Sequence, residues 1–103
     1  MSDKVELIAA AQINVDAGGI SFKSNYGFKT ASRSSPGVYE LNLDHKHDAS
    51  KLVIQVTANN LVGGEIQASP VGTGDTRDIQ LTNFALGGSP ADTPFYITVL
   101  RVR

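Results

Sequence analysis

The sequence predicts a single all-β domain over residues 1–103, an antiparallel, jelly-roll-like β-sandwich of about eight short strands. Three observations predict this fold. Apolar and polar residues alternate with a period of two, which is typical of a strand with one buried face. Turn-forming Gly, Pro, Asn and Asp residues separate these segments at the spacing of about 8–12 residues that is typical of sandwiches. A chain of 103 residues is also the usual size of one domain.

The N-terminal part is predicted to form the first strands. Residues 1–17 are interpreted as a strand or as an attachment arm. A short helix over residues 4–12 is the alternative for part of this region, but a strand is favoured because residues 12–15 continue the β alternation. Three weaker strands are predicted at residues 7–15, 20–22 and 26–31.

The central segments show the clearest one-sided alternation. In residues 38–43, Tyr39, Leu41 and Leu43 share one face, and polar residues occupy the other. Residues 52–57 repeat this pattern, so both segments are predicted to be half-buried strands. Two weaker strands are predicted to follow at residues 65–69 and 78–82.

The last strand is predicted at residues 95–103, and both of its faces are apolar. Phe95, Ile97 and Val99 fall on one face, and Tyr96, Leu100 and Val102 fall on the other. This pattern is typical of a strand that is central in its sheet or covered on both sides. We therefore predict that the second face, with Tyr96, Leu100 and Val102, is covered by another layer of the chain or forms an oligomer interface.

Composition argues against several classes of function. The net charge is −1 and the pI is about 6.0, so we expect no nucleic-acid binding, which needs a basic patch. The chain has no cysteine, which excludes disulfides, thiolate zinc sites and cysteine nucleophiles. Its longest apolar run near the N-terminus is far shorter than the roughly 20 residues that cross a bilayer, so we expect no membrane insertion.

Few side chains could carry out chemistry. His45 and His47 would point the same way in a strand, and with Asp48 they could bind a metal ion, but a solvated hairpin loop is the favoured interpretation. Three further carboxylates, Asp75, Asp78 and Asp92, lie in or beside glycine-rich turns, where aspartate commonly stabilises the turn. No phosphate-binding loop or nucleophile elbow is found, so we predict no enzymatic activity and no cofactor.

One segment has the residue types of a sugar-binding site. Asn25, Tyr26 and Arg33 could stack on a sugar ring and form hydrogen bonds with its hydroxyls. The alternative is structural, because Tyr26 and Phe28 share one face of a predicted strand and could both belong to the core.

Three segments in order resemble a known family. They are Gly37-Val38-Tyr39-Glu40-Leu41-Asn42-Leu43, Lys51-Leu52-Val53-Ile54-Gln55-Val56-Thr57 and Pro94-Phe95-Tyr96-Ile97-Thr98-Val99-Leu100-Arg101. This arrangement is similar to that of small β-sandwich domains in bacteriophage tail fibres and other virion appendages. The resemblance implies a homotrimer without catalytic residues that decorates the particle or contacts host-surface glycans. It also implies other virion proteins as partners, and a location in the virion or, during assembly, in the infected cell.

Other functions stay open at this point. A lectin-like carbohydrate-binding module is one alternative, with Asn25, Tyr26 and Arg33 as the glycan contacts. A second alternative is an inhibitor or adaptor that works by covering the surface of a partner. A small hydrolase is the least favoured function, because nothing in the sequence indicates that a pair of carboxylates or a Ser-His pair converges.

Overall fold

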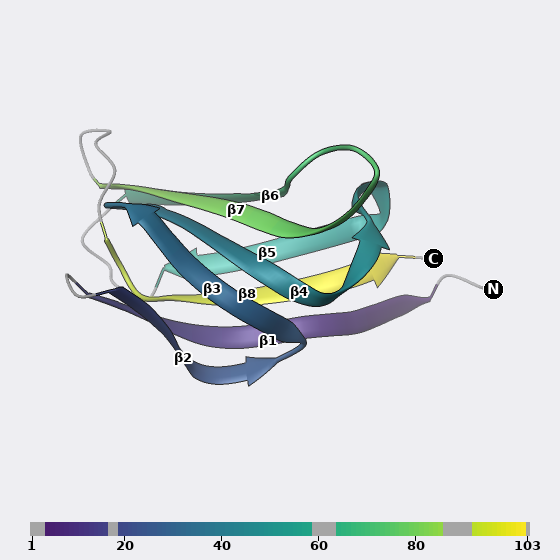
Figure 1. Cartoon of the computed structure of the whole chain (residues 1–103), viewed down its shortest axis with the longest axis horizontal. Coiled ribbons are helices and arrows are strands. Elements are labelled where there is room, and N and C mark those ends of the chain that lie inside the picture. Colours follow the sequence, from purple (N-terminus) through teal and green to yellow (C-terminus); the bar gives the residue numbers. More distant parts are fainter. Residues whose placement is uncertain (1–3, 17–18, 59–63, 86–91, 103) are drawn as a thin grey trace.

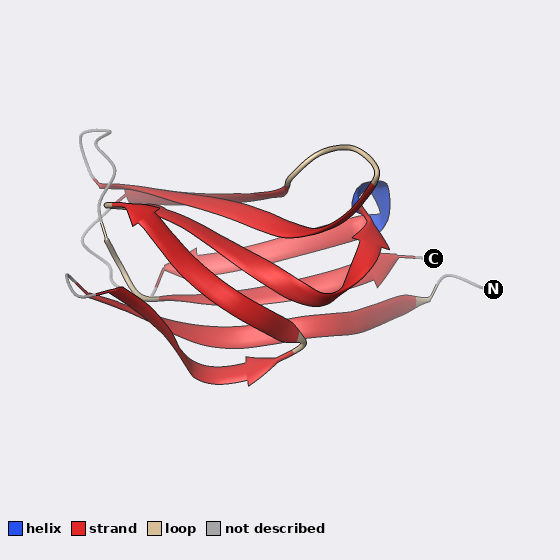
Figure 2. Ribbon diagram, in the orientation of Figure 1, coloured by secondary structure: helices blue, strands red, loops and turns tan. Residues whose placement is uncertain are grey.

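The computed structural model describes residues 4–16, 19–58, 64–85 and 92–102. These residues form eight strands, which Figures 1 and 2 show as a nearly all-strand structure. The strands are β1 (Val5–Asp16), β2 (Gly19–Tyr26), β3 (Phe28–Ser35), β4 (Val38–Asp48), β5 (Leu52–Ala58), β6 (Gly64–Pro70), β7 (Asp75–Ala85) and β8 (Phe95–Val102). A single 3-10 turn, η1 (Ala49–Lys51), joins β4 to β5. Within the described ranges, no helix is long and apolar enough to span a membrane.

The strands form two antiparallel sheets of four strands each. Their orders are β2-β1-β8-β5 and β3-β4-β7-β6, and the two sheets lie as separate layers in Figure 1. This architecture confirms the predicted all-β sandwich of about eight strands. Several strands are longer than the short ones that were predicted, and β1 has 12 residues.

The N-terminal region is part of a sheet. β1 lies between β2 and β8 and is hydrogen-bonded to both, with Val5 opposite Val102 and Ile13 opposite both Phe95 and Phe22. Residues 5–16 therefore form the strand that was one of the two interpretations of residues 1–17, and the alternative of a helix over residues 4–12 is wrong. The buried residues Ala9, Ala11 and Ile13 alternate with less buried ones. This is the period of two of a strand and not the period of 3.6 of a helix.

The core lies between the two sheets. Its largest fully buried side chains come from three strands, and they pack against Ala9 and Ile13 of β1. They are Tyr39, Leu41 and Leu43 of β4, Ile79 and Leu81 of β7, and Phe95, Ile97 and Val99 of β8. The rings of Tyr39 and Phe95 stack with their centroids 5.4 Å apart and so join the two layers. The predicted buried faces of residues 38–43 and 95–103 are thereby confirmed.

Two local predictions are wrong. Residues 26–31 were predicted as one strand, but the chain bends at Gly27, which has φ +85°, and passes from β2 in one sheet to β3 in the other. The predicted loop at residues 45–48 is instead the end of β4, where His47 pairs with Thr76 and Asp48 with Asp75. Backbone pairing with β7 holds this polar segment in a strand, because an exposed strand end needs no apolar face.

Candidate functional site

The outer face of the β3-β4-β7-β6 sheet is polar. The Thr30 hydroxyl donates a hydrogen bond to Asn42 Oδ1 at 2.5 Å, and Asn42 Nδ2 donates to the carboxylate of Asp78. Exposed Ser32, Glu40 and Gln80 continue this polar surface on β3, β4 and β7. Water can solvate such a face, so nothing in its composition requires a partner.

The opposite outer face carries exposed aliphatic side chains. We call Val5, Leu7, Val53, Leu100 and Val102 the apolar patch. Leu7 of β1 pairs with Leu100 of β8, which pairs with Val53 of β5, and Val5 pairs with Val102 in a neighbouring row. The patch therefore spans three adjacent strands. Four of its side chains, all except that of Leu100, keep between 37% and 58% of their surface exposed.

The residues of the predicted oligomer interface separate into two places. Leu100 and Val102 belong to the apolar patch, whereas Tyr96 lies at the other end of β8, opposite Gln12 of β1. β8 is an interior strand, as predicted, since it has β1 on one side and β5 on the other. Its outer face keeps exposed residues, Tyr96 and Val102 among them. The interface itself stays a prediction.

The structure does not bring the predicted sugar-binding residues together. Asn25 closes the turn around Gly27, because its Nδ2 donates to the Phe28 carbonyl at 2.9 Å and its Oδ1 accepts from the Phe28 amide at 3.2 Å. Tyr26 is exposed at the end of β2. Arg33 is near the other end of β3. It follows Tyr26 by seven residues, which is about 20 Å along the chain at the usual rise of a strand.

Arg33 forms a network with Asp92, just before β8. Its Nε and one Nη donate to the two carboxylate oxygens of Asp92 at 3.0 and 2.8 Å. The Gly37 amide and the Tyr39 hydroxyl also donate to Asp92 Oδ1, at 2.9 and 3.0 Å, and the Tyr39 hydroxyl accepts from the Thr93 amide at 3.2 Å. We call these five residues the Asp92 network. It ties the β3–β4 hairpin to the segment that enters β8.

The Asp92 network is suited to structure and poorly suited to acid–base chemistry. Three donors bond to Asp92 Oδ1 and one bonds to Oδ2, so most of the roughly four lone-pair directions of the carboxylate are used. The hydrogen bonds from Arg33, then those from Gly37 and Tyr39, lower the pKa of Asp92 to about 2. The carboxylate is therefore ionised and held by four hydrogen bonds near neutral pH, where a general acid or base must exchange protons.

Tyr39 makes the stability of the chain depend on pH in the alkaline range. Its side chain is only 1% exposed, and burial raises the pKa of Tyr39 to about 12. Because the ordinary value is 10.0, the folded chain holds this proton more tightly than the unfolded chain does. We expect the free energy of unfolding to fall by about 2 kcal/mol between pH 10 and pH 12. Urea denaturation across this range should show the fall, and Tyr39→Phe should remove it; an equal slope in the variant would contradict the prediction.

The histidine segment does not form a metal centre. Among the residues that the structure describes, no group of three or more His, Asp or Glu side chains could hold a metal ion. Asp48 instead accepts hydrogen bonds from the amide and the hydroxyl of Ser50 at 3.0 and 2.8 Å, and these lower its pKa. Burial, then the charge of Arg101 and the neighbouring His45, lowers the pKa of His47. The three carboxylates beside glycine-rich turns have different surroundings. Asp75 pairs with Asp48 at the end of β4, Asp78 lies on the polar outer face, and Asp92 belongs to its network.

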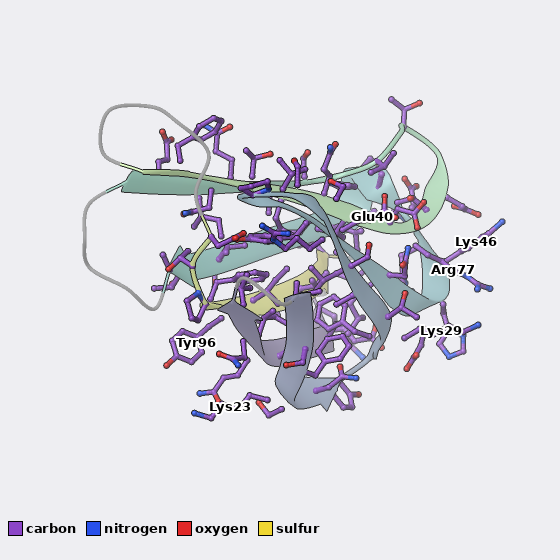
Figure 3. The ribbon with its side chains drawn as sticks, turned by 60° about the vertical axis from the view of Figure 1, so that its left-hand side comes forward. Lys23, Lys29, Glu40, Lys46, Arg77 and Tyr96 are labelled. Carbon is purple, nitrogen blue, oxygen red and sulfur yellow. The ribbon has the colours of Figure 1, made fainter. Side chains whose placement is uncertain are left out.

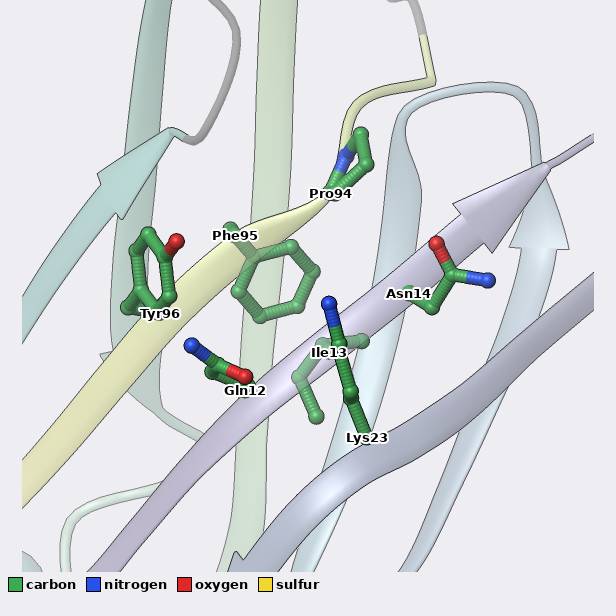
Figure 4. Close-up of a pocket in the computed structure, with 7 residues that line it drawn as sticks. All are labelled: Gln12, Ile13, Asn14, Lys23, Pro94, Phe95 and Tyr96. Atoms are coloured by element: carbon green, nitrogen blue, oxygen red, sulfur yellow. The ribbon is translucent and has the colours of Figure 1, made fainter.

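A small hollow opens on the outer face of the β2-β1-β8-β5 sheet. It has a volume of about 70 Å³ and is lined by Gln12, Ile13 and Asn14 of β1, Lys23 of β2, and Pro94, Phe95 and Tyr96. Figure 4 shows the Lys23 side chain extending across β1 between Gln12 and Asn14. No pattern in the sequence indicated this hollow, because it combines residues from three strands and depends on their register.

Comparison with protein-family models, with curated proteins and with solved structures finds no match to this chain. The resemblance to virion appendage domains therefore stays a prediction, and the geometry of the two outer faces carries the proposals below.

Proposed function

We propose that the chain is a non-enzymatic structural protein that assembles into a homotrimer through the apolar patch. The observation that supports this is the contrast between the two outer faces of the sandwich. One face carries a hydrogen-bonded polar surface, and the other carries five aliphatic residues in contiguous rows. Single exposed apolar residues are common on protein surfaces, but contiguous groups are typical of interaction sites.

A second copy of the chain is the partner that fits this surface most simply. Closed symmetric homo-oligomers are the commonest assemblies of soluble proteins, and they cover the same surface on every copy. Burying an exposed Val or Leu side chain contributes roughly 25 cal/mol for each Å² of apolar surface removed from water. The trimeric state and the role in a virion appendage come from the resemblance of the three sequence segments and are part of the proposal.

The expected result for the unmodified chain is a sedimentation mass of about three times 10.9 kDa at micromolar concentration. Changing Leu7→Lys together with Val53→Lys should reduce this to the mass of one chain, because charges in the patch would lose their hydration on association. Both residues are exposed, so the variant should keep its circular dichroism spectrum. A mass of one or of two chains for the unmodified protein would contradict the trimer.

A matched control places the same charges on the polar face. Ser32→Lys with Gln80→Lys also changes one edge strand and one interior strand at exposed positions. This control should stay trimeric. If both double variants stay trimeric, the apolar patch is not the interface.

The virion role has a separate test, which is the identity of the neighbouring genes. Genes for capsid or tail proteins beside the coding sequence would support this role, and genes for unrelated metabolic enzymes would contradict it.

A further inference from the structure

The hollow on the β2-β1-β8-β5 sheet has the composition of an anion-binding site. Of the side chains that line it, Lys23 alone is charged, and the lining contains no Asp or Glu. The amide side chains of Gln12 and Asn14 lie on either side of the Lys23 side chain, and Tyr96 lies beyond Gln12 (Figure 4). Ile13, Pro94 and Phe95 complete the lining. In Figure 3, Lys23 and Tyr96 lie on one side of the molecule, away from Glu40, Arg77 and Lys46.

Lys23 is directed into the hollow by an irregularity of β2. Ser24 pairs with Gln12 and Phe22 pairs with Ile13, so Lys23 is the extra residue of a β-bulge. A bulge changes the direction of one side chain and is often found beside binding sites. Lys23 forms no ion pair with any residue in the described ranges. Its charge is therefore not neutralised by a described carboxylate.

The size of the hollow limits what can enter it. A cavity of roughly 10–15 Å³ holds one water molecule. The hollow, at about 70 Å³, therefore accommodates a group of a few heavy atoms. A carboxylate has this size and forms charge-assisted hydrogen bonds with an ammonium group. A whole sugar ring is larger, so it would remain outside the hollow, where the Tyr96 ring is 38% exposed.

We propose that this hollow binds the carboxylate of an acidic sugar, such as a uronic or sialic acid. Lys23 pairs with the carboxylate. The amides of Gln12 and Asn14 each offer donors and an acceptor to the neighbouring hydroxyls. Tyr96 presents its ring to the apolar C–H face of the sugar. This inference goes beyond the proposed function, because the apolar patch and the hollow share no residue. Either proposal, the trimer or the acidic-sugar site, can be wrong while the other is right.

The test is a nuclear magnetic resonance titration of the isotopically labelled chain with D-glucuronic acid and, separately, with N-acetylneuraminic acid. At least one of them should shift the resonances of Gln12, Asn14 and Tyr96 in a saturable way. Lys23→Gln should weaken binding at least about tenfold, which corresponds to about 1.4 kcal/mol. Tyr96→Ala should also weaken it. Added salt should weaken binding to the unmodified chain, because the ion pair is exposed to solvent.

Lys29→Gln is the matched control, since Lys29 is an exposed lysine on β3 in the other sheet. This variant should bind like the unmodified chain. Equal binding of methyl glucoside, which lacks the carboxylate, would overturn the role of the charge. Equal binding of acetate would overturn the role of the sugar. The absence of saturable shifts with both acidic sugars would overturn the site, whatever the oligomeric state of the chain.

Discussion

Gly27→Ala is expected to remove at least about 4 kcal/mol from the free energy of unfolding, which is a large fraction of the roughly 5–15 kcal/mol of a typical domain. A Cβ atom at this position would lie 2.1 Å from the carbonyl oxygen of Ile8 and 2.9 Å from the Cα of Ala9. Both are backbone atoms of β1, so no side-chain rotation can relieve the overlap. The φ of +85° adds strain for any residue with a side chain. The result should be a chain that unfolds at much lower urea concentration or does not fold.

Gly72→Ala separates the steric effect from the backbone effect. Gly72 has nearly the same φ, +87°, but a Cβ there would meet nothing within 4 Å. This variant should therefore lose only about 1 kcal/mol, the usual penalty for alanine at positive φ. Urea midpoints measured by circular dichroism compare the two variants. If the two losses agree within 1 kcal/mol, the close packing of Gly27 against β1 does not matter to stability.

Gly27 also illustrates what the sequence could predict and what it could not. Alternation in residues 38–43 and 95–103 predicted the strands and their buried faces, because burial on one side of a sheet selects every second residue. The bend at Gly27 left no such pattern. The amide of Asp44 donates to the Gly27 carbonyl at 2.9 Å. The carbonyl oxygen of Ile8 lies close to the Cα of Gly27, where a side chain would begin. Partners distant in sequence therefore determine this bend.

The candidate sites also combine features that the sequence could predict with features that it could not. The two apolar faces of the last strand predicted that Leu100 and Val102 would need cover, and the structure adds Leu7 and Val53 beside them. The sugar-binding prediction grouped Asn25, Tyr26 and Arg33 by their proximity in sequence. A strand separates residues that are seven apart, however, whereas pairing between strands joins residues that are distant in sequence.

Asp92 is the clearest case of a residue whose role depends on such distant partners. It follows a glycine-rich segment, and its position in the sequence suggested a turn. In the structure it accepts hydrogen bonds from Arg33, Gly37 and Tyr39, which precede it by more than 50 positions. Nothing in the local sequence marks an aspartate as the acceptor for a distant arginine, because the pairing requires both sheets to be formed.

Asp92→Asn should lower the free energy of unfolding by about 2 kcal/mol at pH 7. The asparagine side chain has nearly the shape of the aspartate side chain, but it has no charge. Its NH₂ group would also face donors from Arg33, Gly37 or Tyr39, and two donors cannot form a hydrogen bond with each other. The Asp92 side chain is only 22% exposed, so water cannot fully replace the lost hydrogen bonds. Asp44→Asn, at an exposed position on β4, is the control and should change stability little. Thermal and urea denaturation measure both variants.

The same variant should also change how stability depends on acid. The pKa of Asp92 is about 2 in the folded chain, below its ordinary value of 3.8, so the folded chain binds fewer protons between these values. The stabilisation by Asp92 is therefore complete above about pH 5 and is lost as the pH falls towards 2. Denaturation curves of the unmodified chain and of Asp92→Asn should converge over this range. A difference between them that is as large at pH 2 as at pH 7 would mean that shape, and not the ionised carboxylate, joins the hairpin to β8.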